Sequence, residues 1–151
     1  LLAENPNNLS FHYTDIEIDI AEKNHQLAVS KLNKLLTLNP NNYPLMVLKS
    51  EALWQDHSYD SADSVLTALS RMRTQDPMIW YRLAEVRGLA GNISGLHQAR
   101  AEYFILIGVF DKAREQLGLA AKLASSDFKQ SAIIRQRLRD LAQMEDRAEK
   151  L

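Results

Sequence analysis

The sequence predicts an all-α fold built from repeated pairs of helices. Only five Gly and four Pro occur among its 151 residues, and these two residue types disfavour helix interiors more than any others. The segment Leu1–Asn8 (LLAENPNN) returns 34 residues later as Leu35–Asn42 (LLTLNPNN), with six of the eight positions identical. Self-similarity at a period of about 20–50 residues is typical of solenoids, in which each unit buries its apolar face against the next.

Length, charge and composition narrow the classes of function. The chain suits one domain, and its 46% hydrophobic and 25% charged residues are ordinary for a folded globular protein. A formal net charge of −1 argues against a strongly basic binder of nucleic acid or lipid headgroups. Without Cys, disulfide scaffolds and Cys-ligated zinc sites are excluded. No apolar run approaches the roughly 20 residues that a membrane-spanning helix needs.

The opening residues resemble the end of a helix rather than the start of a protein. No Met begins the chain, and no signal peptide precedes the first predicted helix. We therefore expect a fragment of a longer protein. A mature N-terminus left by processing is the alternative.

The first two full repeats predict four helices. The 34-residue step takes Ala28 to Ala62 and Leu32 to Leu66, so a small residue recurs where two helices must approach closely. Pro40 and the Asn residues around it end the second helix, because a residue that precedes Pro disfavours the helical conformation. We expect helices over residues 9–22, 26–38, 44–56 and 59–72.

The start of the third repeat resembles a known helix pair. Asp76 suits the N-cap and Pro77 the first helical turn, where a missing N–H costs nothing. Trp80, followed three residues later by Leu83 and then by a small residue, resembles the W-x2-L-G start of the 34-residue tetratricopeptide repeat. Gly91 breaks the helix where the turn belongs. The sequence thus predicts a tetratricopeptide-repeat solenoid, with further helices over residues 77–90 and 94–107.

Two more helices, over residues 111–124 and 127–149, complete the predicted fold. Asp111 can cap the first of them, and Ser126 or Asp127 the second. The last helix carries apolar residues on one face and charged residues elsewhere, as the end of a solenoid requires. We interpret it as a C-terminal capping helix, and a docking helix for another domain is the alternative. The apolar face consists of Ile134, Leu138, Leu141 and Ala148.

The predicted organisation is a single domain over residues 1–151. The third repeat matches only in part, because Leu96 and Arg100 stand where the earlier repeats have a small and an apolar residue. The repeat units are expected at about 9–42, 43–76 and 77–110, followed by the helix at 111–124 and the terminal helix at 127–149.

Four strings in residues 76–124 carry a more specific resemblance, and none of them is a catalytic motif. They are W-Y-x-L-A-E at 80–85, G-L-A-G-N at 88–92, H-x-A-R-A-E-Y at 97–103 and G-x-x-D-x-A-x-x-Q-L at 108–117. Together they resemble a narrower family, the C-terminal repeat domain of periplasmic zinc metalloproteases of the beta-barrel assembly-enhancing protease type. The similarity covers about a third of the chain.

This resemblance implies a parent protein with an N-terminal protease domain that carries an HExxH zinc site. It implies a periplasmic location and three kinds of partner: the protein's own protease domain, the outer-membrane assembly machinery, and unfolded outer-membrane proteins. The zinc belongs to that protease domain, and no catalytic residue can be assigned in this chain.

The residues themselves predict no catalysis, metal or cofactor here. The four His residues are not spaced as the HExxH pair requires, and no G-x-S-x-G or phosphate-binding Gly motif occurs. Arg135, Arg137 and Arg139 form a basic cluster on the last helix, which we interpret as a solvated face rather than a nucleic-acid site. Trp54 and Trp80 are expected to pack between helices.

The expected binding surface is the groove lined by the first helix of each repeat, where equivalent residues lie in neighbouring rows. An aromatic and apolar row beside an acidic row would suit an extended peptide with apolar side chains and a basic or amide-rich surface. Chance is the alternative, because Glu is a frequent helix former. The predicted partner-binding residues are Tyr13, Val47 and Tyr81 in the first row, Glu17, Glu51 and Glu85 in the second, and Arg82 beside them.

The function predicted from the sequence is therefore non-catalytic protein binding: substrate or partner docking for a periplasmic metalloprotease-chaperone that serves outer-membrane protein assembly and quality control. Two alternatives stay open. One is a standalone tetratricopeptide scaffold in a cytoplasmic assembly. The other is an enzyme in its own right.

Overall fold

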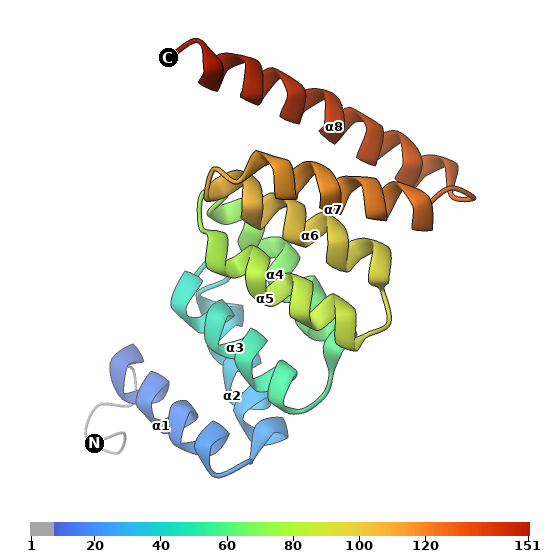
Figure 1. Cartoon of the computed structure of the whole chain (residues 1–151). Coiled ribbons are helices and arrows are strands. Elements are labelled where there is room, and N and C mark those ends of the chain that lie inside the picture. The colour runs from blue at the N-terminus through green and yellow to red at the C-terminus, as the bar shows by residue number, and fades with distance from the viewer. Residues whose placement is uncertain (1–7) are drawn as a thin grey trace. The chain divides into compact units, whose positions relative to one another are not determined.

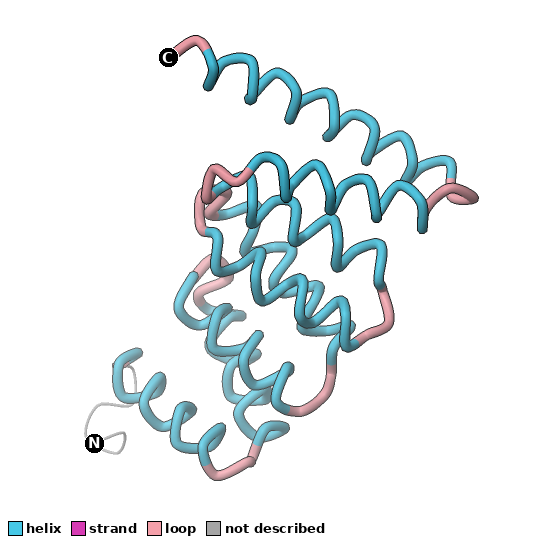
Figure 2. Tube along the Cα trace, viewed as in Figure 1, coloured by secondary structure: helices cyan, strands magenta, loops and turns pink. Residues whose placement is uncertain are grey.

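Eight helices account for most of residues 8–151, the part that the computed structural model describes, and that part contains no strand (Figures 1 and 2). Each helix begins and ends within one residue of its predicted bounds. The helix end expected in the opening residues lies outside the described part. The helices are α1 (Leu9–Ala21), α2 (His25–Leu38), α3 (Tyr43–Gln55), α4 (Tyr59–Met72), α5 (Pro77–Leu89), α6 (Ile93–Leu106), α7 (Phe110–Leu123) and α8 (Phe128–Glu149).

The chain divides into two compact units, and the boundary between Leu69 and Ser70 falls in the last turn of α4. In the first unit, α1 packs against α2 and α3, and α2 packs against α3. The side chain of Asn8 caps α1 and that of Asn42 caps α3. A core cluster of this unit consists of Ile16, Ile20, Ala28, Leu32, Leu45, Leu48 and Ala52.

The turn inside each helix pair repeats as faithfully as the helices do. Lys23, His57 and Gly91 are spaced by 34 residues, and all three adopt the left-handed conformation, with φ of 65°, 61° and 82°. In each turn the following amide donates a hydrogen bond of 2.8–2.9 Å to the carbonyl five residues earlier. This conformation costs a non-Gly residue roughly 1–2 kcal/mol. The turn geometry is therefore kept even where the sequence does not supply Gly.

In the second unit, α5 packs against α6, α6 against α7, and α7 against α8. Asp76 caps α5 by accepting the Met78 amide at 3.0 Å, and Asp127 caps α8, so both predicted caps are confirmed. A core cluster joins α6, α7 and α8. It consists of Ala101, Ala113, Leu117, Ala120, Ala124, Ile134 and Leu141.

The prediction that Asp111 caps α7 is wrong. The Val109 amide donates to the Phe104 carbonyl at 2.8 Å, which closes the turn around Gly108 and places Val109 at the N-cap. Asp111 consequently lies inside the first turn, where its carboxylate accepts a hydrogen bond from Arg114 at 3.1 Å.

The expected apolar face of α8 is shorter than predicted. Ile134 and Leu141 are each 1% exposed and Leu138 packs beside them, but Ala148 is exposed. The reason is length: the 22 residues of α8 span about 33 Å, whereas the 14 residues of α7 span about 21 Å. The end of α8 therefore has no equal length of α7 to cover it.

In the third helix pair, the small side chain lies on the first helix and the large one on the second, which is the reverse of the first two pairs. The 34-residue step takes Ile20 to Trp54 to Gly88, and Ala28 to Ala62 to Leu96. A Cβ atom added at Gly88 would lie 2.7 Å from the Leu96 Cδ1 atom, so the small residue in this pair sits on α5 instead of α6. Trp54 and Trp80, which we expected to pack between helices, are only partly buried.

Adjacent isoleucines on α8 provide a test of its capping role. Ile134→Ala should destabilise the protein by about 2–5 kcal/mol, because it leaves a cavity in the core of the second unit. Ile133 is 48% exposed, so Ile133→Ala should change the free energy of unfolding by less than about 1 kcal/mol. Urea denaturation of both variants measures the difference. Equal effects would show that α8 is not part of the core.

Candidate functional site

In the first unit, α1 presents Tyr13 and Glu17 one helical turn apart. Tyr13 is partly buried against the core, and Glu17 is exposed. Burial raises the pKa of the Tyr13 phenol, and the charge of the Glu17 carboxylate raises it further. The two side chains therefore share one face of α1.

On α3, Val47 and Glu51 are both partly buried. The Gln55 side-chain amide donates to Glu51 Oε1 at 2.7 Å. This carboxylate is thus already engaged within its own helix, and it is a less accessible charge than the sequence suggested.

In the second unit, Tyr81, Arg82 and Glu85 lie on α5. Arg82 Nη1 donates to Glu85 Oε2 at 2.8 Å, so the two charges neutralise each other. Tyr81 is 55% exposed, and its ring meets that of Tyr103 from α6 edge to face, with centroids 5.7 Å apart.

A hollow of about 260 Å³ opens between α5 and α6 in the second unit. Two of the predicted residues line it, Tyr81 and Glu85. Sequence reasoning missed the contribution of α6, although one signal was present: Arg100 departs from the leucines of the earlier repeats. The lining residues are Tyr81, Ala84, Glu85, Arg100, Tyr103 and Phe104.

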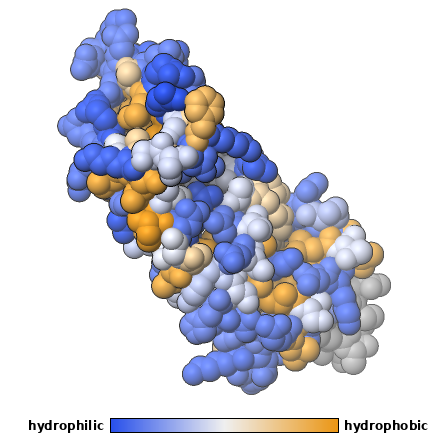
Figure 3. Space-filling view, turned by 90° about the vertical axis from the view of Figure 1, so that its right-hand side faces the viewer, coloured by the Kyte–Doolittle hydropathy of each residue, from blue (hydrophilic) through white to orange (hydrophobic). Residues whose placement is uncertain are grey.

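Two larger hollows, of about 680 and 340 Å³, lie elsewhere in the second unit and share Arg87, Gln98 and Ile133. Trp80 lines the smaller one together with residues of α8. Leu123 and Phe128, beside the α7–α8 turn, are 54% and 84% exposed. Figure 3 shows that hydrophobic residues reach the surface in separate patches among hydrophilic ones.

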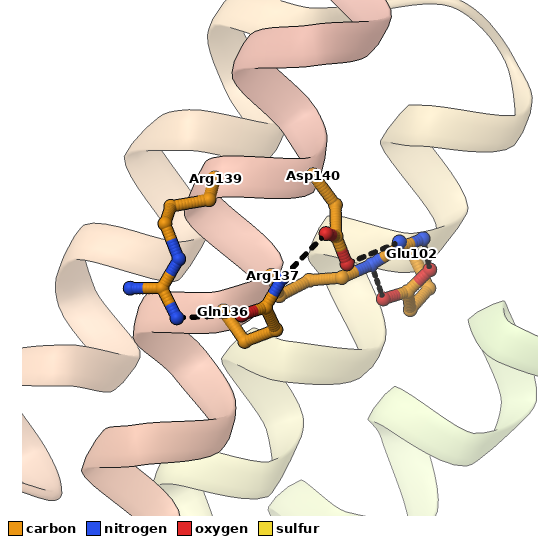
Figure 4. Close-up of polar contacts among 5 residues, drawn as sticks. All are labelled: Glu102, Gln136, Arg137, Arg139 and Asp140. Carbon is orange, nitrogen blue, oxygen red and sulfur yellow. Dashed lines mark hydrogen bonds and ion pairs between the residues drawn. The ribbon is translucent and has the colours of Figure 1, made fainter.

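A network of charged side chains links α8 to α6 (Figure 4). Arg137 Nε and Nη2 donate to the two carboxylate oxygens of Glu102 at 2.6 and 2.7 Å, which raises the pKa of Arg137. Asp140 lies 3.5 Å from the same guanidinium, and Arg139 donates to Gln136. Bidentate pairs of this kind are the stronger class of ion pair. The charge of Arg137 is consequently used to hold α8 in place.

Within residues 8–151, no group of three His, Cys, Asp or Glu side chains converges as a metal site would require. In the same part of the chain, no helix combines the length and the apolar character needed to cross a membrane.

No protein-family model matches this sequence. Among solved structures, the MamA RS-1 ArsTM double mutant aligns with a TM-score of 0.65 at 21% identity, over 96% of this chain and 81% of that one. A second MamA crystal structure gives 0.64 at 16% identity, over 99% and 85%. TTC0263, a thermophilic tetratricopeptide protein of Thermus thermophilus, gives 0.54 at 18% identity, over 93% and 84%.

A tetratricopeptide-repeat protein of Parabacteroides merdae gives a TM-score of 0.54 at 17% identity, over 94% of this chain and 60% of that one. At these identities the likeness concerns the fold. It confirms the fold class predicted from the sequence: the chain is an all-α tetratricopeptide-repeat solenoid.

Proposed function

We propose that this chain is a non-catalytic protein-binding domain that docks segments of a partner protein, with candidate surfaces on α1 and α3 in the first unit and on α5 in the second. The observation that carries the proposal is the hollow beside α5, where Tyr81 and Glu85 lie together as part of one accessible surface. The repeat fold supports it, because stacked helix pairs present extended binding surfaces.

A more specific proposal is that the domain serves a periplasmic zinc metalloprotease with a chaperone role in outer-membrane protein assembly and quality control. Its support is the set of strings shared with the beta-barrel assembly-enhancing protease type, which fall on α5, the α5–α6 turn, α6 and α7. The partners would be the parent's protease domain, the outer-membrane assembly machinery and unfolded outer-membrane proteins. The zinc would belong to the protease domain.

A standalone repeat scaffold in a cytoplasmic assembly is the second candidate. The observation in its favour is that this fold makes up 81% and 85% of the two MamA chains. The sequence of the complete gene separates the two candidates. A signal peptide and an HExxH motif would support the protease, and their absence would support the scaffold.

The absence of catalysis is a testable part of the proposal. The purified chain should bind no stoichiometric zinc and should cleave neither casein nor an unfolded outer-membrane protein, because it lacks the HExxH pair. Elemental analysis and a gel-based cleavage assay measure both properties. One tightly bound zinc ion per chain, or cleavage by the chain alone, would contradict the proposal.

Charge reversal on α1 tests the binding face. Glu17 is exposed and borders Tyr13, so Glu17→Lys should weaken the binding of an unfolded outer-membrane barrel protein by about two- to fivefold, the effect of losing a surface ion pair. The loss should shrink at high salt, because exposed charges are screened. Calorimetry at two ionic strengths, with circular dichroism as a check on folding, measures it.

The matched control is Glu149→Lys in the last turn of α8, where the carboxylate is exposed and a positive charge is tolerated. If Glu17→Lys and Glu149→Lys bind equally well, the acidic face of α1 plays no part in recognition. If the unmodified chain does not bind the barrel protein, the outer-membrane role is contradicted.

A further inference from the structure

One departure from the repeat pattern coincides with a hollow. The 34-residue step takes Leu32 to Leu66 to Arg100. Leu32 is 0% exposed and Leu66 is 1% exposed, so this position belongs to the core in the first two repeats. Arg100 is exposed and lines the hollow between α5 and α6. At this position the third repeat thus has a cation that lines the hollow, where the first two repeats have a buried leucine.

The walls of this hollow are largely aromatic. The rings of Tyr81 and Tyr103 meet edge to face at 5.7 Å, and those of Tyr103 and Phe104 at 5.5 Å. Ala84, which is only 4% exposed, also lines it. Its volume of about 260 Å³ lies below the roughly 300–1,000 Å³ of sites for small molecules. It is better matched to one or two side chains of a partner.

Two charged side chains line the hollow, Glu85 and Arg100. Among the described residues, Glu85 is the only carboxylate that lines the hollow, and it is paired with Arg82 at 2.8 Å. Lys112 Nζ lies 5.6 Å from the centre of the Phe104 ring. Within residues 8–151, Arg100 forms no hydrogen bond or ion pair. Because Glu85 is paired with Arg82, Arg100 is the charged side chain of this lining that remains available to a ligand.

We infer that this hollow binds an acidic side chain of a partner protein segment, with an adjacent aromatic or large apolar side chain packed on the rings of Tyr81 and Tyr103. The guanidinium of Arg100 can donate two parallel hydrogen bonds to a carboxylate, which a single ammonium group cannot do. This inference rests on the proposed protein-binding function. According to this inference the second unit prefers an acidic ligand, whereas the acidic row predicted from the sequence suited a basic one.

Selection from a random peptide library tests the inference. Peptides displayed on phage are selected at low salt on the immobilised 151-residue chain, with parallel selections on Arg100→Leu, Arg100→Lys and Arg135→Leu. Leu is the residue of the two equivalent positions, so Arg100→Leu should keep the helical circular dichroism and thermal midpoint of the unmodified chain. Arg135 is exposed on α8, so Arg135→Leu removes the same charge away from the hollow.

The expected result is enrichment of peptides that carry Asp or Glu next to an aromatic or large apolar residue. Arg100→Leu should raise their Kd about tenfold or more, the loss expected for a charge-assisted bidentate contact. Arg100→Lys should have an intermediate effect, because it keeps the positive charge but loses the paired N–H donors of the guanidinium. Arg135→Leu should leave the Kd within about twofold, since exposed charges outside the contact have small effects.

Enriched peptides that are basic or purely apolar, or that bind Arg100→Leu as tightly as the unmodified chain, would overturn the inference and leave protein binding standing. A library that yields no peptide above a surface coated with an unrelated protein would overturn both the inference and the proposed function.

Discussion

Two helices of a pair can pack closely only where at least one of the facing side chains is small. In the first two repeats Ala28 and Ala62 supply that small side chain, and both are fully buried. In the third repeat Leu96 takes the equivalent position, and the small residue is Gly88 on the facing helix. A Cβ atom added at Gly88 would lie 2.7 Å from the Leu96 Cδ1 atom. Since protein interiors are close-packed, the sum of the two sizes is constrained even though either helix can carry the smaller one.

The third repeat also differs from the first two at position 100 of α6. Ala99 and Ala101 are buried, and Arg100 between them is exposed. An arginine there does not need to be desolvated without a partner, which would be costly. It can instead line a hollow whose other walls come from the aromatic residues of α5 and α6.

The sequence predicted the eight helices well, because their ends are marked by local features such as Asp76, Asp127 and the turn at Gly91. It misplaced the cap of α7, because the N-cap position after the turn at Gly108 is occupied by Val109, whose side chain makes no capping hydrogen bond. It located Tyr81 and Glu85, but not the hollow they share, since that space depends on how α6 packs. The pairing of Glu85 with Arg82 was visible in principle, because residues three apart on a helix are neighbours.

A double-mutant cycle at Gly88 and Leu96 tests the packing rule most directly. Gly88→Ala is introduced into the unmodified chain and into Leu96→Ala, and the free energy of unfolding is measured by urea denaturation in all four proteins. We predict that Gly88→Ala is more favourable in the Leu96→Ala background by at least about 0.5 kcal/mol, because the added methyl group then has room and Ala gains up to about 1 kcal/mol over Gly in a helix. The same effect in both backgrounds would contradict the account.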